Sequence, residues 1–372
     1  MGIGLNWNKK RLQELEGALK SASDNIASLQ KQVATISGIF NSMVEGVVAV
    51  DTATRIISIN PAIEKIFGIK EEEAKDKLFL EVIRNNDIAE VIDLCLSNKE
   101  IIQKELGLSW PVQKTFQINA SPILEGEAVS GCLAVIHDIT EIRRLETIRR
   151  DFVANISHEL KTPITSIKGF VETLLSGGLE DNKNCRDFLR IIDEHTDRLN
   201  SLINDLLALS YLESKEVGLE KEKVNLKELA DKVLTGFQSQ LKKKGIEVTN
   251  GIKAEIYLYL DKDKIHQVFT NLLDNAIKFN KEKGFINIYS EDLNEKIKVA
   301  IEDSGSGIPA KDISRIFERF YRVDKARSRE LGGTGLGLSI VKHIIELHAG
   351  LVGVESTEGL GSKFFFYLPK II

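Results

Sequence analysis

Apolar side chains recur at alternating spacings of three and four along the first forty residues, from Leu12 to Met43. This heptad pattern continues for more than four repeats without a proline, which is typical of a two-stranded parallel coiled coil. A surface helix packed on its own domain is the alternative, and the unbroken stripe favours the coiled coil. We therefore predict a coiled-coil signalling helix over residues 1–36.

The apolar pattern changes near Val44. Residues 45–69 predict a strand, a turn, a second strand and a helix, with Asn60 as the N-cap and Pro61 at the first helical position. Residues 114–140 predict two longer strands joined by a glycine-containing turn. The expected result is a small antiparallel sheet with helices on one side.

Two amphipathic helical stripes follow, between Ile139 and Tyr211. The run "SGGLEDNKN" separates them, because its paired glycines end the first helix. Two helices joined by a short loop form a hairpin, and each hairpin leaves its apolar stripes incompletely covered. Pairing two hairpins across a two-fold axis buries the stripes in a four-helix bundle. We assign this hairpin to residues 141–217.

The composition fits a chain with several packed cores and restricts its partners. The 372 residues include 42% hydrophobic and 28% charged residues, which is enough for two to four domains. The 50 basic and 55 acidic residues are well mixed, so nothing indicates a nucleic-acid partner. No apolar run approaches the ~20 residues that cross a bilayer. Three dispersed cysteines, Cys95, Cys132 and Cys185, form no zinc or disulfide pattern and favour a reducing compartment.

The C-terminal region, residues 218–372, contains four short motifs in order. The first, "HQVFTNLLDNAIKF", places Asn271, Asn275 and Lys278 on one helical face, because they are four and three residues apart. Two carboxamides and an ammonium group on one face suit a metal ion and phosphate oxygens. Taken singly, each is equally well explained as a helix-surface side chain.

The other three motifs are built around glycines. In "VAIEDSGSGIP" a strand delivers Asp303 into a turn made by Gly305 and Gly307. In "GGTGLGLSIVKHIIEL" glycines open a helix, whose first amides and positive dipole end favour anions. In "EGLGSKFFFYLP" a glycine turn lies inside a hairpin. One glycine motif is weak evidence, whereas four motifs in this order together indicate a nucleotide site.

The stretch "NISHELKTPITSIKG" combines a histidine, a carboxylate and a proline within a helical pattern. A neutral imidazole is a competent nucleophile near pH 7, and Glu159 is placed to orient the ring of His158 and to accept its proton. Thr162 lies one turn further on, on the same face. Pro163 removes a hydrogen bond to the carbonyl of Glu159, and we expect a locally deformable helix there. A solvated surface histidine is the alternative reading.

Three families resemble these segments. Residues 37–140, with "SINPAIEKIFG" and a terminal "DITE", resemble a PAS sensor domain. The motif "SHELKTP" is similar to the phosphoacceptor motif of sensor histidine kinases of two-component systems. The four C-terminal motifs resemble the Bergerat ATP-binding fold, shared by those kinases, type II topoisomerases, mismatch-repair ATPases and a chaperone family. The resemblance implies a multidomain α+β chain: a coiled coil, a PAS α/β domain, a dimeric four-helix bundle and an α/β-sandwich ATP-binding domain over residues 218–372.

The resemblance also implies roles for the C-terminal motifs. Asp303 would accept a hydrogen bond from the adenine amino group, Asn275 would bind Mg²⁺, and the segment 308–332 would form a mobile lid. Asn271 and Lys278 would lie near the phosphates. The expected ATP-binding set is Asn271, Asn275, Lys278, Asp303, Gly305, Gly307, Gly333, Thr334, Gly335, Leu336 and Gly337.

One position separates the branches of this fold. Hydrolytic relatives place a glutamate four residues before the metal-binding asparagine, and here that position is Asn271. Without that base, the resemblance implies transfer of the γ-phosphoryl group to His158 and then to an aspartate of a response regulator. Thr162 implies a phosphatase activity toward the same regulator. The alternatives are an ATPase that works by conformational cycling and a catalytically inactive, sensor-driven dimer.

The expected cofactors are ATP and Mg²⁺. We expect no chromophore in the PAS region, because Cys95 lacks the context of a flavin-binding cysteine and no haem-ligating histidine stands out. The expected partners are a second copy of the chain and a response-regulator receiver domain, without nucleic acid. We expect a cytoplasmic location, either for a whole protein or for the cytoplasmic portion of a membrane-anchored sensor whose transmembrane region lies upstream.

Overall fold

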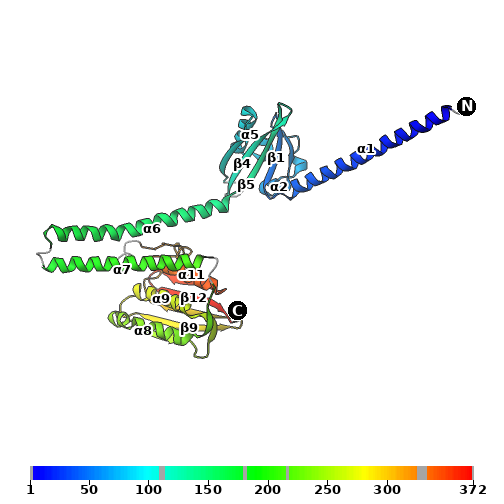
Figure 1. Ribbon diagram of the computed structural model, residues 1–372. Helices are drawn as coiled ribbons and strands as arrows, with labels where there is room; N and C mark the ends of the chain where they lie inside the picture. The colour runs from blue at the N-terminus through cyan, green and yellow to red at the C-terminus, as the bar shows by residue number, and fades with distance from the viewer. Residues whose placement is uncertain (1–2, 109–113, 179–181, 215–217, 325–332, 371–372) are drawn as a thin grey trace. The chain divides into compact units, whose positions relative to one another are not determined.

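The computed structural model describes residues 3–108, 114–178, 182–214, 218–324 and 333–370. Contacts between Cα atoms divide the chain into two compact units, Met1–Arg149 and Arg150–Ile372 (Figure 1). None of the helices in the described ranges combines the length and apolarity that a membrane crossing requires. The two units are described separately below.

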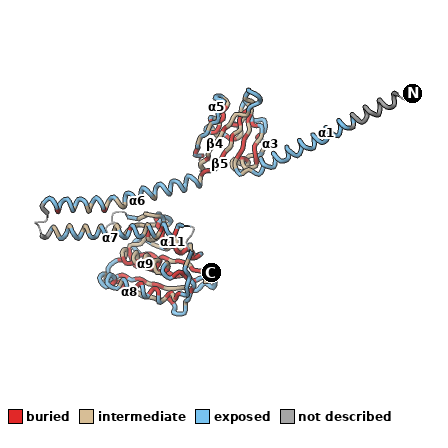
Figure 2. Tube along the Cα trace, in the orientation of Figure 1, coloured by how far each residue is buried: buried red, intermediate tan, exposed pale blue. Residues whose placement is uncertain are grey.

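The first unit begins with one continuous helix, α1 (Ile3–Ser42), as the heptad pattern predicts. The side chains that form its apolar stripe are exposed along the described part, with Leu19 77%, Ile26 56% and Leu29 59% exposed (Figure 2). The side chain of Leu12 lies outside the described residues. An apolar stripe of this length in water is stabilised by a partner surface, so α1 by itself presents an incomplete packing arrangement.

An antiparallel sheet forms the body of the first unit. Its strands are β1 (Gly46–Asp51), β2 (Ile56–Ile59), β3 (Ile102–Leu108), β4 (Lys114–Glu125) and β5 (Ala128–Asp138), in the order β2-β1-β5-β4-β3. Four helices connect β2 to β3: α2 (Pro61–Phe67), α3 (Glu71–Ala74), α4 (Phe79–Ile83) and α5 (Asn86–Asn98). Helix α5 packs on β3, β4 and β5 and encloses an apolar core that includes Phe79, Ile92 and Phe116. This arrangement confirms the predicted sheet with helices on one side.

The side chain of Asn60 connects the start of β1 to the first turn of α2. Its side-chain oxygen accepts hydrogen bonds from the backbone N–H of Val47 at 2.9 Å and of Ile63 at 3.2 Å. Its amide donates to the carbonyl of Glu45 at 2.8 Å. The Ile63 contact is the N-cap of α2 that the sequence predicts, and Pro61 occupies the first helical position. The full burial of Asn60 is stable because each of these polar contacts replaces water.

The second unit opens with the helical hairpin. Helix α6 (Thr140–Thr173) ends in a short π-helical segment (Leu174–Gly178), and α7 (Asn182–Glu213) returns alongside it (Figure 1). Pro163 is buried inside α6, and the helix continues through it without a break. One set of apolar side chains on α7 (Leu202, Leu209 and Leu212) is buried against the core of the domain that follows. Other apolar side chains of the hairpin, such as Leu207 on α7 and Ile164 on α6, remain exposed.

A two-layer α/β domain completes the second unit. Its main sheet has the order β11-β12-β10-β9-β7, with only the β7–β9 pair parallel, among the strands of the described residues. The strands are β7 (Glu247–Gly251), β9 (Phe285–Leu293), β10 (Lys296–Asp303), β11 (Leu351–Thr357) and β12 (Gly361–Pro369), and β6 (Lys221–Asn225) pairs separately with β8 (Tyr257–Asp261). Helices α8 (Leu226–Lys244), α9 (Lys262–Lys278) and α11 (Gly337–Leu347) pack against the main sheet (Figure 1). The rings of Phe269 and Phe366 meet edge-on in this core, with centroids 5.9 Å apart.

The start of α9 is fixed by a buried histidine. His348 follows α11, and its Nε2 accepts the backbone N–H of Asp261 at 3.1 Å, while its Nδ1 donates to the carbonyl of Ile344 at 2.8 Å. The carboxylate of Asp261 caps α9 by accepting the N–H of Lys264 at 3.1 Å. Burial lowers the pKa of His348, so the neutral ring is the form that fits. These contacts lock α9, which carries the first asparagine motif, to α11.

Candidate functional site

The phosphoacceptor motif lies on an exposed face of α6. His158 is exposed, and Thr162, one turn later, donates its hydroxyl proton to the carbonyl oxygen of His158 at 3.1 Å. Pro163 has no N–H to give to the carbonyl of Glu159, so this turn of the helix has one backbone hydrogen bond fewer. The hydroxyl of Thr162 therefore supports the backbone at the point where the proline weakens it.

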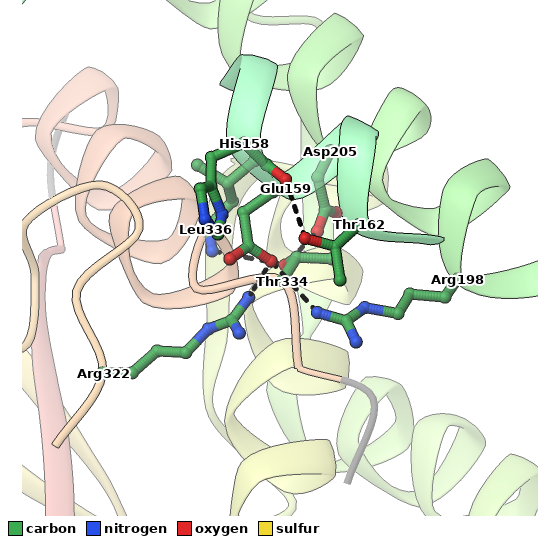
Figure 3. Close-up of polar contacts among 8 residues, drawn as sticks. All are labelled: His158, Glu159, Thr162, Arg198, Asp205, Arg322, Thr334 and Leu336. Carbon is green, nitrogen blue, oxygen red and sulfur yellow. Dashed lines mark hydrogen bonds and ion pairs between the residues drawn. The ribbon is translucent and has the colours of Figure 1, made fainter. Parts of the chain in front are cut away.

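The carboxylate of Glu159 is held by two guanidinium groups (Figure 3). Its Oε2 atom lies 3.0 Å from the Nη2 atom of Arg198 on α7 and 3.1 Å from the Nη2 atom of Arg322. The three side chains are largely withdrawn from water, with 14% of Glu159 and 6% of Arg322 exposed. Charge-assisted hydrogen bonds in such a place are stronger than at the open surface, so the carboxylate has a defined orientation.

A second contact joins α7 to the glycine motif. Thr334 donates its hydroxyl proton to Oδ2 of Asp205 at 2.6 Å and accepts the backbone N–H of Leu336 at 3.3 Å. Burial raises the pKa of Asp205, and the hydrogen bond from Thr334 opposes that rise. Figure 3 shows His158, Glu159, Thr334 and Leu336 converging at one place between α6 and the start of α11. The structure therefore brings the predicted phosphoacceptor to the predicted glycine motif.

Asp303 ends strand β10 inside the domain, as the second motif predicts. Its Oδ1 accepts the backbone N–H of Gly305 at 2.8 Å, and burial raises its pKa to about 6. Gly307 has φ +66°, and a Cβ atom there would lie 2.0 Å from the carbonyl oxygen of Thr357, so no other residue fits. A buried carboxylate with few partners is suited to accept a hydrogen bond from a ligand.

Three predicted residues share one face of α9. The side-chain amide of Asn271 donates to the carbonyl of Gly337 at 3.1 Å, which ties α9 to the start of α11. Asn275 is half-buried one turn further on, and Lys278 forms an ion pair with Asp274 at 2.7 Å. Within the described ranges no cluster of three or more His, Cys, Asp or Glu side chains is arranged to hold a metal ion. Mg²⁺ takes oxygen ligands and usually keeps several waters, so the Asn275 amide oxygen as one of its ligands stays a prediction.

The glycine motif opens α11, as predicted. Gly337 begins the helix, and Leu336 precedes it as a fully buried N-cap residue. Gly335 has φ +77°, and its carbonyl accepts the N–H of Phe320 at 2.9 Å. A Cβ at Gly335 would lie 3.0 Å from the Cα of Phe320, so the tight approach of the two segments requires glycine. Gly333 is half-buried just before this turn.

The described part of the predicted lid, residues 308–324, contacts the hairpin. The rings of Phe320 and Phe152 lie with centroids 5.8 Å apart, and the guanidinium of Arg319 lies 5.0 Å above the ring of Phe152. Arg319 also pairs with Glu213 at the end of α7, and His343 of α11 lies 3.5 Å from the same carboxylate. The remainder of the predicted lid, residues 325–332, lies outside the described residues.

Three charged residues of this site were missed by the sequence reasoning: Arg198, Asp205 and Arg322. Arg198 and Asp205 are one heptad apart and border the apolar stripe of α7. The seven-residue spacing of Arg198 and Asp205 beside the stripe is the one sequence feature that places both on the same side of α7. Arg322 lies in a segment with no helical or strand period, and nothing in its spacing points to Glu159.

Family models match the three segments separately. Residues 35–139 match the PAS fold, residues 148–215 match the His Kinase A (phospho-acceptor) domain, and residues 260–372 match the histidine kinase-, DNA gyrase B- and HSP90-like ATPase model. The matched segments contain the sheet of the first unit, most of the hairpin, and the part of the following domain from α9 onward, which carries the glycine motifs.

Whole-chain comparisons agree with these matches. The chain is 32% identical over 372 residues to a sensor protein kinase WalK of Staphylococcus aureus, covering 99% of this chain and 86% of the relative. A WalK of strain Newman shows the same identity, but the chain spans only 59% of its length. The solved structure of the histidine kinase ThkA in complex with the response regulator protein TrrA has a TM-score of 0.50 and 28% identity, covering 89% of this chain and 97% of that one. On these matches, the chain belongs to the PAS-containing sensor histidine kinases.

Proposed function

We propose that this chain is an ATP-dependent protein-histidine kinase that transfers the γ-phosphoryl group of ATP to His158 and from there to an aspartate of a response regulator. The names of its relatives support the kinase activity, and the complex of ThkA with TrrA supports a response regulator as the partner.

The side chain at position 271 is the observation that carries this proposal. The resembling hydrolytic proteins have a glutamate there, which activates water, whereas Asn271 has a neutral amide whose N–H donates to the carbonyl of Gly337. An amide cannot accept a proton from water near neutral pH. The γ-phosphoryl group therefore needs another acceptor, and the exposed imidazole of His158 lies beside the same glycine motif (Figure 3).

In the proposed reaction, one ring nitrogen of His158 forms a bond to the γ-phosphorus while the bond to the bridging oxygen of ADP breaks. The other ring nitrogen gives its proton to the carboxylate of Glu159. The amide oxygen of Asn275 would hold Mg²⁺, which would supply charge neutralisation at the phosphate oxygens. Positioning and charge neutralisation supply most of the catalysis in phosphoryl transfer, so few side chains need to react.

Asp303 and the glycine motifs hold the nucleotide in this proposal. The buried carboxylate of Asp303 accepts the adenine amino group, beside the turn of Gly305 and Gly307. Asn271 and Lys278 lie toward the phosphates, and the turn of Gly333, Thr334 and Gly335 together with Leu336 and Gly337 receives them at the start of α11. The proposed phosphatase role of Thr162 uses its hydroxyl oxygen to position a water, since its proton is already donated to the backbone.

We also propose a homodimer. The exposed apolar stripes of α1 and of the hairpin supply the surfaces. The domain division over residues 1–36, 37–140, 141–217 and 218–372 is proposed with it. The free cysteines fit a reducing cytoplasm, since Cys95 and Cys132 are buried as thiols.

Incubation with ATP labelled at the γ-phosphate tests the reaction. Wild-type chain is expected to acquire base-stable, acid-labile label, and His158→Gln is expected to acquire none. His195→Gln is the matched control, because it removes a histidine of the same hairpin from α7. Steady release of inorganic phosphate without any labelled histidine would contradict the proposed function.

A further inference from the structure

Glu159 is shared between two arginines that come from different parts of the second unit. Both guanidinium groups contact the same atom, Oε2, at 3.0 Å for Arg198 and 3.1 Å for Arg322 (Figure 3). Arg198 lies in the hairpin that carries Glu159, 39 residues along the chain. Arg322 lies 163 residues away, in the domain with the glycine motifs. The Arg198 contact belongs to the hairpin itself, whereas the Arg322 contact exists only while that domain rests on the hairpin.

The two contacts have opposite consequences for a proton acceptor. One guanidinium on a carboxylate fixes its direction, which helps a base that must meet one nitrogen of an imidazole. A second guanidinium adds a further partner that stabilises the ionised carboxylate and opposes its protonation. Glu159 is therefore held in a defined orientation, and both arginines favour its ionised form.

The contact between Thr334 and Asp205 indicates the same resting arrangement independently. Thr334 lies in the glycine motif, where the proposed site receives phosphates, yet its hydroxyl is engaged by a carboxylate of α7 at 2.6 Å. A triphosphate entering this turn would meet the charge of Asp205, and the two anions repel. While the domain rests on the hairpin, two groups of the proposed reaction are therefore engaged in other contacts. Glu159 contacts Arg322, and Thr334 contacts Asp205.

We propose that Arg198 is a positioning residue that orients Glu159 toward His158, and that Arg322 is a removable second partner that keeps Glu159 unreactive while the ATP-binding domain rests on its own hairpin. The inference rests on the proposed kinase function. Nucleotide phosphates displace Asp205 from Thr334, and the domain shifts on the hairpin so that Arg322 leaves Glu159 while the glycine motif stays within reach of His158. Glu159 then keeps Arg198 as its orienting partner.

Arg198 is tested by the rate of phosphohistidine formation in the full chain as a function of ATP concentration. Arg198→Gln is expected to lower the rate at saturating ATP about tenfold, a part of the ~100-fold or more that a positioned base contributes. The ATP concentration for half-maximal rate should not change, and Arg198→Lys should restore part of the rate. Arg190→Gln is the matched control, since Arg190 is exposed on α7 and pairs with acidic residues of its own helix.

Arg322 is tested in the same assay with the opposite expectation. Arg322→Gln keeps a polar side chain but removes the charge, and it is expected to raise the rate at saturating ATP about threefold or more, because Glu159 loses the partner that opposes its protonation. The half-saturating ATP concentration should stay the same or fall. A lower rate, or a higher half-saturating concentration, would show that Arg322 serves catalysis or binds phosphate, and would overturn the inference.

The wild-type result separates the two proposals. If wild-type chain forms no base-stable label, both the proposed function and this inference are overturned. If wild type is labelled and both arginine variants behave like Arg190→Gln, only this inference is overturned. If Arg198→Gln also loses ATP binding, measured directly with a fluorescent nucleotide, then Arg198 supports the fold rather than Glu159, and its positioning role is rejected.

Discussion

The buried carboxylate of Asp303 makes nucleotide affinity depend on pH in a calculable way. Burial raises its pKa to about 6, and the ionised form is the stronger acceptor for an adenine amino group, because protonation turns one oxygen into a donor. The ionised fraction is about 97% at pH 7.5 and about 24% at pH 5.5 for a group with this pKa. Affinity should therefore fall by up to about fourfold over this range. The loss occurs as pH falls through the pKa, since a proton competes with the ligand for the same oxygen.

Adenosine is the ligand for this measurement, because it carries the amino group without phosphates that titrate in the same range. Its dissociation constant is followed by chemical-shift titration of the full chain at pH 7.5, 6.5 and 5.5. Asp303→Asn is the control: its amide oxygen keeps an acceptor that cannot be protonated, so its weaker affinity should not vary with pH. Equal affinity of the wild type at pH 7.5 and 5.5, or the same pH dependence in the control, would refute the assignment of Asp303.

Three further outcomes are expected. Burial lowers the pKa of His348, so below pH ~6.5 the unfolded chain binds a proton that the folded chain does not, and the free energy of unfolding falls as pH decreases. In urea unfolding, the difference in free energy of unfolding between wild type and His348→Gln should therefore shrink from pH 7 to 5.5. A difference that stays constant would contradict this. Asp205→Asn should tighten ATP binding severalfold in a fluorescent-nucleotide assay, whereas Asp187→Asn, an exposed change on the same helix, should leave it unaltered. Replacing Leu19 and Ile26 together by lysine should shift the chain toward monomer in sedimentation, and an unchanged dimer would reject α1 as a dimer surface.

Local chemistry explains why so much of the fold was predictable. The N-cap at Asn60 is formed with residues that directly follow it, namely Pro61 and the N–H of Ile63. A short stretch of sequence is therefore enough to predict it. The turn at Gly307 and the helix opening at Gly337 are likewise set by residues within a few positions. The period of α7 predicted which side would be buried, and Leu202 and Leu209 are indeed buried.

The unpredicted part of the site consists of long-range polar pairs. The partners of Glu159 lie 39 and 163 residues away, and the hydroxyl of Thr334 meets a carboxylate 129 residues earlier. Such pairs depend on how one domain docks on another, which no local period records. An arginine beside an apolar stripe looks the same in a sequence whether it faces water or a buried carboxylate. The sequence therefore supplies the residues of the proposed reaction and leaves out the residues that contact them across long distances in the chain.

The restraining contacts follow from one physical requirement of the proposed reaction. An imidazole nucleophile with its base already adjacent in sequence, as His158 and Glu159 are, is assembled in every conformation of the hairpin. The adjacency of the two residues in the sequence does not determine when the imidazole reacts. The reaction must therefore be controlled through the base or through the access of the imidazole to the phosphate. The structure has a contact of each kind: Arg322 reaches the base, and Asp205 reaches the glycine turn at Thr334. Since both contacts need the domain to rest on its hairpin, any movement that separates the two releases both together.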